Sequence, residues 1–197
     1  MNGIVKTNNK YKADCIIEMN KTGNRFYSSI KSKNCSYSSI INHTPRKAKI
    51  FTKNGLLNKY IDSLDKIIKE YISKRKLKLF GEDINLINLE CCSDNLIFND
   101  FLKVISYFVF DGTGKGESSC KANSIIYYGN NNIEFIKCQS IEEKKNYIKS
   151  ISNKLILSLR DKGMPKKICE EHKPWIFNHN KQDGCIRYKG CLHIRLK

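Results

Sequence analysis

The chain has 197 residues, enough for one well-packed core and few for two independent domains. Lys and Arg number 36 against 19 Asp and Glu, a formal net charge of +17 that favours a polyanionic partner. Hydrophobic residues make up 40% of the chain, which argues against disorder, and no apolar run reaches the ~20 residues of a membrane helix.

The cysteines and the N-terminus indicate the compartment. Nine cysteines, an odd number, are scattered among charged residues, and the opening MNGIVKTNNKYK lacks the apolar region of a secretory signal. We therefore expect a cytoplasmic protein with reduced thiols and no membrane partner.

Residues 10–33 predict a β-hairpin that carries an acid on one strand and a lysine on the other. Alternating apolar and polar residues form the first strand, a polar turn with a glycine follows, and the chain then returns. A turn centred between residues 22 and 23 places Asp14 opposite Lys31 and Ile16 opposite Ser29. Because side chains alternate along a strand, Ser29 and Lys31 share one face.

This pairing suits metal-dependent hydrolysis of a phosphodiester. A carboxylate such as that of Asp14 can bind a hard cation, Mg²⁺ above all, which polarises the phosphate and supplies hydroxide. The Lys31 ammonium would orient the water or offset developing charge. The alternative is an ordinary cross-strand ion pair with no catalytic role.

The arrangement resembles the PD-(D/E)xK nuclease family, in particular its restriction endonucleases, in which an Asp begins one strand and an acid-x-Lys triplet lies on the next. Here Ala13-Asp14 corresponds to the first element and Ser29-Ile30-Lys31 to the second. The resemblance extends over residues 9–43, which include a small, polar and basic segment after the lysine. It implies a Mg²⁺-dependent endonuclease with Asp14, Ser29 and Lys31 as catalytic residues and Asp14 as the metal ligand.

The chain departs from the family pattern in three ways. Ala13 stands where the family has a proline, which matters little. Ser29 stands where the family has its second acid, so one metal ligand is missing. Glu18 shares the face of Asp14 but lies about 13 Å along the strand, so Asp111 or an ordered water is needed to complete the site. The family also has a helix and a strand ahead of the first Asp, whereas residues 1–13 are short and polar, so we expect either that these N-terminal elements are lacking or that their order is unusual.

Two helical segments follow the hairpin. Apolar residues at helical spacing predict a helix over residues 54–76 with Asn54 as its N-cap. Residues 82–94 fit either a strand or a short helix. Asn99 is then expected to cap a second helix with an apolar stripe that contains Phe101.

A glycine-rich loop at residues 111–119 lacks both the Walker spacing and GxGxxG. We interpret it as a loop whose amides and Lys115 approach a DNA phosphate, and it is similar to a segment found downstream of the core in some restriction endonucleases. A second hairpin is expected around the turn at 129–132. Its Glu134 and Lys137 point to opposite faces, which argues against an alternative catalytic pair.

The last third of the chain predicts a long helix and basic strands. Ser140 and Glu143 form a capping box that opens a helix running to Gly163. In the basic C-terminal strands of 165–197, the stretch 185–197 places its basic residues on one face, which is either a DNA contact or a solvated surface. The same region offers zinc-type ligands without regular spacing: Cys169, His172, Cys185, Cys191 and His193.

Together these elements predict one nuclease-like α/β or α+β domain over residues 1–197, with a mixed central sheet flanked by helices and a restriction-endonuclease-like core. We expect a Mg²⁺-dependent, type II restriction-like endonuclease acting on double-stranded DNA, with a cognate methyltransferase encoded separately. A homodimer is one assembly that the resemblance allows, since enzymes cutting both strands of a palindrome are commonly symmetric. The side chains expected to contact DNA are Lys33, Ser36, Arg46, Lys47, Lys115, Arg187, Lys189 and Arg195.

Two other function classes fit the same sequence. One is a non-catalytic, basic nucleic-acid-binding protein or a decayed nuclease whose metal site has lost an acid. The other is a small interaction module stabilised by zinc at the C-terminal cysteines. The recognition sequence depends on side chains in the major groove, which no linear pattern identifies.

Overall fold

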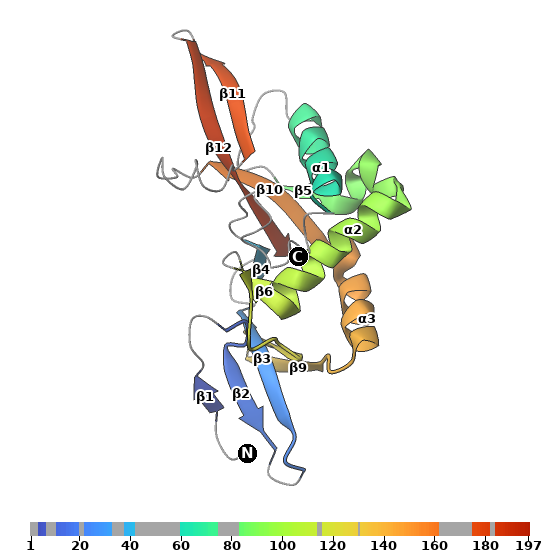
Figure 1. The fold of residues 1–197 in the computed structure, drawn as a ribbon, viewed down its shortest axis with the longest axis vertical. Coiled ribbons are helices and arrows are strands. Elements are labelled where there is room, and N and C mark those ends of the chain that lie inside the picture. The colour runs from blue at the N-terminus through green and yellow to red at the C-terminus, as the bar shows by residue number, and fades with distance from the viewer. Residues whose placement is uncertain are drawn as a thin grey trace.

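A computed structural model describes residues 4–6, 11–19, 22–32, 38–41, 60–74, 83–113, 116–129, 131–161, 175–181 and 184–197. Within these ranges the side chains of 4–6, 38, 61, 113, 159–161, 175–181 and 184–191 are not described. Figure 1 shows strands on one side of the molecule and helices on the other.

The first sheet contains five strands in the order β1-β2-β3-β8-β9. Strand β2 is antiparallel to β1 and β3, β8 is parallel to β3, and β9 is antiparallel to β8. The expected mixed sheet is therefore present, and β3 is its central strand. The bounds are β1 Ile4–Lys6, β2 Cys15–Glu18, β3 Arg25–Ser32, β8 Ser124–Gly129 and β9 Asn132–Lys137.

Strand β1 corrects one expectation. It pairs with β2 from Ile4↔Ile17 to Lys6↔Cys15, so a strand does precede Asp14. The short apolar stretch Ile4-Val5 is enough for this, because an edge strand needs only one hydrogen-bonded neighbour.

A second sheet has the order β11-β12-β10-β5, and β4 pairs with β12. The strands form two sheets, not one central sheet, together with a two-stranded hairpin of β6 and β7 in the glycine-rich loop. The bounds are β4 Ser38–Ile41, β5 Ile84–Asn85, β6 Gly112–Thr113, β7 Gly116–Glu117, β10 Leu155–Asp161, β11 Trp175–Lys181 and β12 Gly184–Leu196.

The described residues contain three α-helices, α1 Ile61–Lys74, α2 Asn95–Ser106 and α3 Ile141–Ile151. Helix α2 contacts both α1 and α3. The three helices lie together beside the sheets (Figure 1). In the described part of the chain, none of them has the length and apolar character needed to cross a membrane.

The predicted start of helix α2 was wrong. Helix α2 begins at Asn95, because the Asp94 side chain accepts hydrogen bonds from the N–H groups of Leu96 and Ile97 and caps it there, ahead of Asn99. Between α1 and α2, residues 84–93 form a short strand followed by 3₁₀ turns.

The capping box of Ser140 and Glu143 is present, but α3 ends at Ile151 after about three turns. A 3₁₀ turn at Ser152–Lys154 follows, and the apolar run after it becomes strand β10. Apolar residues on both sides of that strand are buried, and such a run fits a helix and a strand equally well by periodicity alone.

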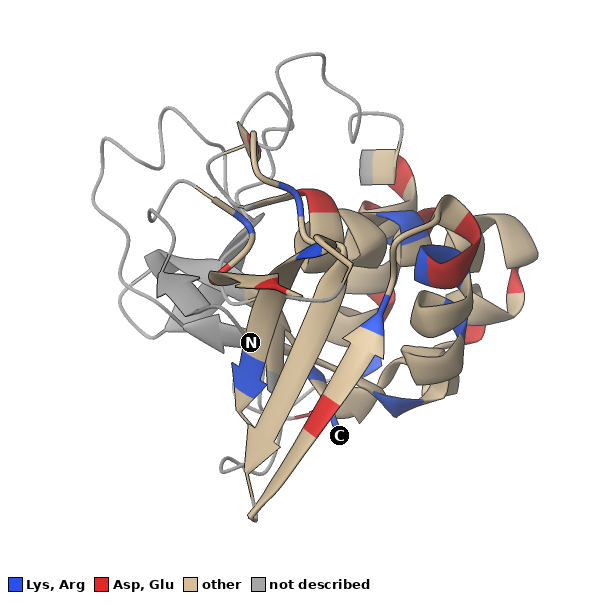
Figure 2. Ribbon diagram, turned by 90° about the horizontal axis from the view of Figure 1, so that it is seen from below, with Lys and Arg blue, Asp and Glu red and all other residues tan. Residues whose placement is uncertain are grey.

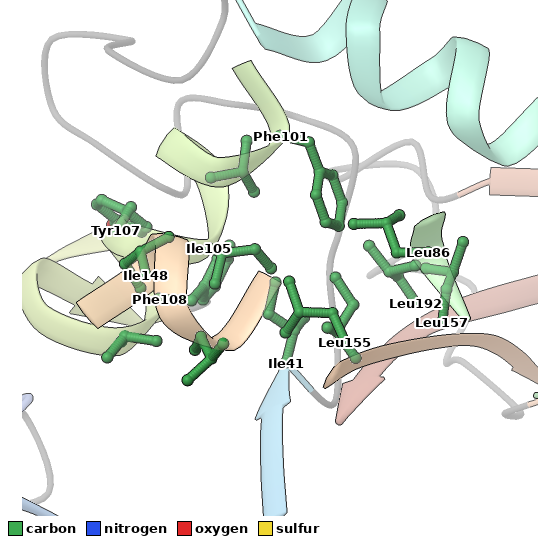
Figure 3. Close-up of a cluster of buried hydrophobic side chains, with 14 of the residues drawn as sticks. Ile41, Leu86, Phe101, Ile105, Tyr107, Phe108, Ile148, Leu155, Leu157 and Leu192 are labelled. Atoms are coloured by element: carbon green, nitrogen blue, oxygen red, sulfur yellow. The ribbon is translucent and has the colours of Figure 1, made fainter. Parts of the chain in front are cut away.

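The main core joins the helices to both sheets (Figure 3). Strand β8 contributes Ile125 and Tyr127, and helix α2 contributes Phe101 and Ile105. Burying each such side chain contributes roughly 1.5–3 kcal/mol. In the parallel register of β3 and β8, Ser29 pairs with Ile125 and Lys31 with Tyr127. Neighbours in register share a face, so Ser29 and Lys31 lie on the side of the first sheet that faces the helices.

Candidate active site

The hairpin of β2 and β3 has a different register from the expected one. The pairs run from Cys15↔Ser28 to Glu18↔Arg25, so Ser29 rather than Lys31 lies across from Asp14. The expected pairing of Asp14 with Lys31 was therefore wrong by two residues. A shift of two residues leaves every side chain on its original face.

The turn explains the shift. The N–H groups of Thr22 and Gly23 both donate to the Met19 carbonyl, at 3.3 and 2.9 Å, and the centre of the turn lies one residue closer to its N-terminal strand than expected. Gly23 has a φ of +66°, the left-handed region that glycine adopts most easily. Met19 was expected to end the strand and instead forms the base of the turn.

Asp14 is fixed by strand β3. Its Oδ2 accepts a hydrogen bond from the Ile30 N–H at 2.7 Å and one from the Ser29 hydroxyl at 3.3 Å. Its own N–H donates to the Ser28 carbonyl at 2.8 Å. The carboxylate thus has one oriented oxygen, and Ser29 directly contacts the group that it was expected to assist.

Lys31 lies on the same face and is half-buried. Burial lowers the pKa of Lys31, and the charge of Asp14 acts in the opposite direction. Among the described residues no carboxylate oxygen lies within 4.0 Å of its ammonium group. The structure therefore brings Asp14, Ser29 and Lys31 into one region, with Asp14 and Lys31 interacting through space.

A second lysine belongs to this cluster. The half-buried side chain of Lys12 interacts with Lys31, Asp14 and Asp111, which come from three different segments. Its pKa is lowered to about 7, mainly by burial and also by the charge of Lys31, and the two carboxylates oppose the change. The sequence held one signal for Lys12, its position two residues before Asp14, since alternate residues of an extended chain share a side.

The backbone of Lys12 is held by the segment after the glycine-rich loop. Its N–H donates to the Ser118 Oγ at 2.8 Å and to the Cys120 carbonyl at 3.1 Å. The Ser118 N–H in turn donates to the Asp111 carbonyl at 2.9 Å. This segment therefore fixes the N-terminal entry to β2 and brings Asp111 into the cluster.

Asp111 ends a π-helical turn that follows α2, at Tyr107–Asp111. Its Oδ1 lies 3.6 Å from the Nζ of Lys144 on α3. The carboxylate is thus close enough to act on Lys12, while its nearest described cation is Lys144. The cluster contains the acid that we expected to complete the site, but Asp111 already has an ion pair.

The described residues fit a magnesium ion with a single protein carboxylate. Mg²⁺ is commonly held by one or two carboxylates, with water and substrate phosphate completing its octahedron. No described residue hydrogen-bonds the Oδ1 of Asp14, which leaves that oxygen available. In the described part of the chain no group of three or more His, Cys, Asp or Glu side chains is arranged to hold a metal.

The eight side chains expected to contact DNA fall into three groups. Five of them lie outside the described residues: Lys33, Ser36, Arg46, Lys47 and Lys115. Arg187 and Lys189 lie on β12, where only the backbone is described. The side chain of Arg195 forms an ion pair with Asp83 and is 13% exposed, which leaves little of it accessible to a phosphate.

The zinc interpretation of the C-terminal region also lies largely outside the described residues, which exclude Cys169 and His172. His193 is buried, and its Nε2 lies 3.4 Å from the Oγ of Ser39 on β4. The basic face expected on this strand is therefore not exposed at His193, which is buried and contacts the Ser39 side chain.

Charged residues are sparse along the strands of the first sheet and more frequent on the helices (Figure 2). The cluster of Lys12, Asp14 and Lys31 is an exception to this distribution.

Comparison of the chain with protein-family models, with curated proteins and with solved structures finds no match.

Proposed function

We propose that this protein is a Mg²⁺-dependent endonuclease that hydrolyses phosphodiester bonds of double-stranded DNA, with a restriction-endonuclease-like core. The observation that carries the proposal is the position of Asp14, Ser29 and Lys31, on one side of two adjacent strands in a mixed sheet. This is the arrangement expected from the resemblance to the PD-(D/E)xK family. The relative position of these three residues depends on the tertiary structure, because β3 is held between β2 and β8.

Each residue has a definable task in this reaction. Asp14 is oriented by the Ile30 N–H through one oxygen, and its other oxygen would hold the metal. A metal held there would supply polarisation of the phosphate and a lower pKa of its water. The Lys31 ammonium lies where it can bind a phosphate oxygen and offset negative charge that develops there. Its half-buried position strengthens that interaction, since charges attract more strongly away from bulk water.

The charge of the chain supports DNA as the substrate. A formal charge of +17 attracts the DNA backbone at long range and releases counterions on binding. Basic residues outside the cluster would then hold the duplex while the cluster contacts a single phosphate.

A second function is favoured by one specific observation. Ser29 replaces the second acid, and the described residues contain no cluster of three metal ligands. A DNA-binding protein descended from a nuclease would have this property. It would bind duplex DNA through the same basic surface without cutting it.

The test is a cleavage assay on plasmid and phage DNA with Mg²⁺ or EDTA. Asp14→Asn is the sharpest variant, because an amide oxygen can still accept the Ile30 N–H while the charge is lost. Lys31→Met removes the ammonium and keeps an unbranched apolar chain, and Lys66→Met on the exposed side of α1 is the matched control.

Discrete Mg²⁺-dependent fragments with wild type and Lys66→Met, and none with the two site variants, would support the nuclease. Fragments that persist with Asp14→Asn would exclude this site. Retarded but intact DNA with the wild type at every Mg²⁺ concentration would favour the non-catalytic function.

A further inference from the structure

Two lysine side chains approach Asp14 from different elements. Lys12 precedes β2, and Lys31 lies in β3. Both are half-buried, and each interacts electrostatically with the other and with Asp14. Among the described residues neither ammonium has a carboxylate oxygen within 4.0 Å.

The neighbouring charges do not neutralise this pair. Asp111 faces Lys12 but has its closest described cation in Lys144, at 3.6 Å. The carboxylate of Glu117, further along the chain, already forms an ion pair with Lys121 at 2.5 Å. Among the described residues Asp14 is therefore the carboxylate that both amino groups share, while Asp111 divides its charge between Lys12 and Lys144. An anion bound between the two amino groups would favour their protonated forms, against the effect of burial.

The cations are arranged before any ligand arrives. The Lys12 backbone is fixed by hydrogen bonds to Ser118 and Cys120, and Ser118 is itself buried. Lys31 is fixed by the pairing of β3 with β2 and β8. Binding an anion here would order little additional backbone, which lowers the entropic cost of association.

We propose that Lys12 and Lys31 together form a subsite for one phosphodiester group of the DNA backbone, beside Asp14. A phosphodiester carries one negative charge and two non-bridging oxygens, so each ammonium can contact one of them. Lys12 supplies the contact that the acid-x-Lys pattern does not contain. That the anion is DNA rests on the proposed function. The subsite itself concerns binding and requires no cleavage.

The experiment measures binding without catalysis. A short fluorescent DNA duplex is titrated with the protein in EDTA over a series of salt concentrations. Loss of one phosphate contact reduces the slope of log K against log salt by about 0.9. We expect that reduction with Lys12→Met, a similar one with Lys31→Met, and wild-type slopes with Lys12→Arg and Lys66→Met.

Either of two results would contradict the proposed subsite. An unchanged slope with Lys12→Met would do so even if that variant cleaved DNA poorly, because Lys12 would then act only through the fold. Absence of duplex binding by the wild type would do so as well. Thermal unfolding of each variant shows whether the fold is kept, and Lys12→Arg, which retains the charge, shows whether the charge accounts for any loss.

The subsite and the nuclease can fail separately. A wild-type protein whose salt slope depends on Lys12 but which cuts no DNA would retain the subsite and lose the proposed function. Mg²⁺-dependent cleavage with no change of slope in Lys12→Met would retain the nuclease and remove the subsite.

Discussion

Replacing Ser29 by Asp tests whether this position is that of a missing metal ligand. The Ser29 hydroxyl lies 3.3 Å from the Oδ2 of Asp14, and Ser29 is 1% exposed. A carboxylate at the same place would form a close, partly buried pair of like charges with Asp14. Such a pair is unfavourable alone and favourable around a divalent cation.

The magnitude follows from that distance. Two unit charges about 3.3 Å apart repel by roughly 5 kcal/mol at an effective dielectric constant of about 20. We therefore expect Ser29→Asp to be less stable than wild type in EDTA. A cation at a hundred times its dissociation constant stabilises the fold by about 2.7 kcal/mol, which for a chain of this size raises Tm by about 5–10 °C.

The assay is thermal unfolding in EDTA, in Mg²⁺ and in Ca²⁺. Ser29→Asn is the matched control, because it adds a side chain of nearly the same size without the charge. The relevant quantity is the metal-induced change in Tm of Ser29→Asp minus that of Ser29→Asn. If this difference is zero at saturating metal, Ser29 does not occupy a ligand position, and its correspondence with the second acid of the family pattern must be abandoned.

Four further predictions concern stability. Asp14→Ala should lower the unfolding free energy by about 0.5–1.5 kcal/mol, since the exposed Ile30 N–H exchanges its acceptor for water, and equal urea midpoints for Asp14→Ala and wild type would contradict this. Burial raises the pKa of Glu70, but hydrogen bonds from Cys91, Lys74 and the Glu90 backbone outweigh it and hold the value at about 2, below the ordinary 4.5. The Glu70 contribution is therefore complete above pH 4.5 and lost as the pH falls towards 2, so Glu70→Gln should flatten Tm against pH in that window. Ser140→Ala should cost about 0.5–2 kcal/mol by removing the cap of α3, measured by urea unfolding, with no loss of DNA binding. Tyr127→Phe should cost about 1–3 kcal/mol, because the buried Tyr147 hydroxyl loses its partner at 2.5 Å, and an unchanged urea midpoint would argue against that contact.

Local patterns predicted the elements that depend on neighbouring residues. The two hairpins and the capping box of Ser140 were confirmed, because alternation, turn residues and N-cap chemistry act within a few positions. The face shared by Ser29 and Lys31 was also predicted correctly, since a register error of two residues preserves it.

Long-range features were missed for a physical reason. The N–H of Lys12 reaches Ser118, 106 residues later in the chain, and no local pattern encodes that contact. The apolar run after Ile151 was assigned to a helix, because its membership in a sheet is determined by β12 and β5. The turn closed at Met19 through backbone hydrogen bonds, which are insensitive to side-chain identity.

The parallel pairing of β3 with β8 also affects how the protein folds. Ser28 and Ser124 share a buried hydroxyl contact at 2.7 Å across a sequence separation of 96 residues. The Tyr27 N–H donates to the Asn123 side chain over the same separation. Contacts between such distant residues form slowly, because the entropy of closing the loop is lost before they are gained. During synthesis the strand that carries Lys31 therefore has its antiparallel neighbour β2 long before β8 is available, and the region around Asp14 and Lys31 is completed only after helices α1 and α2 have been made.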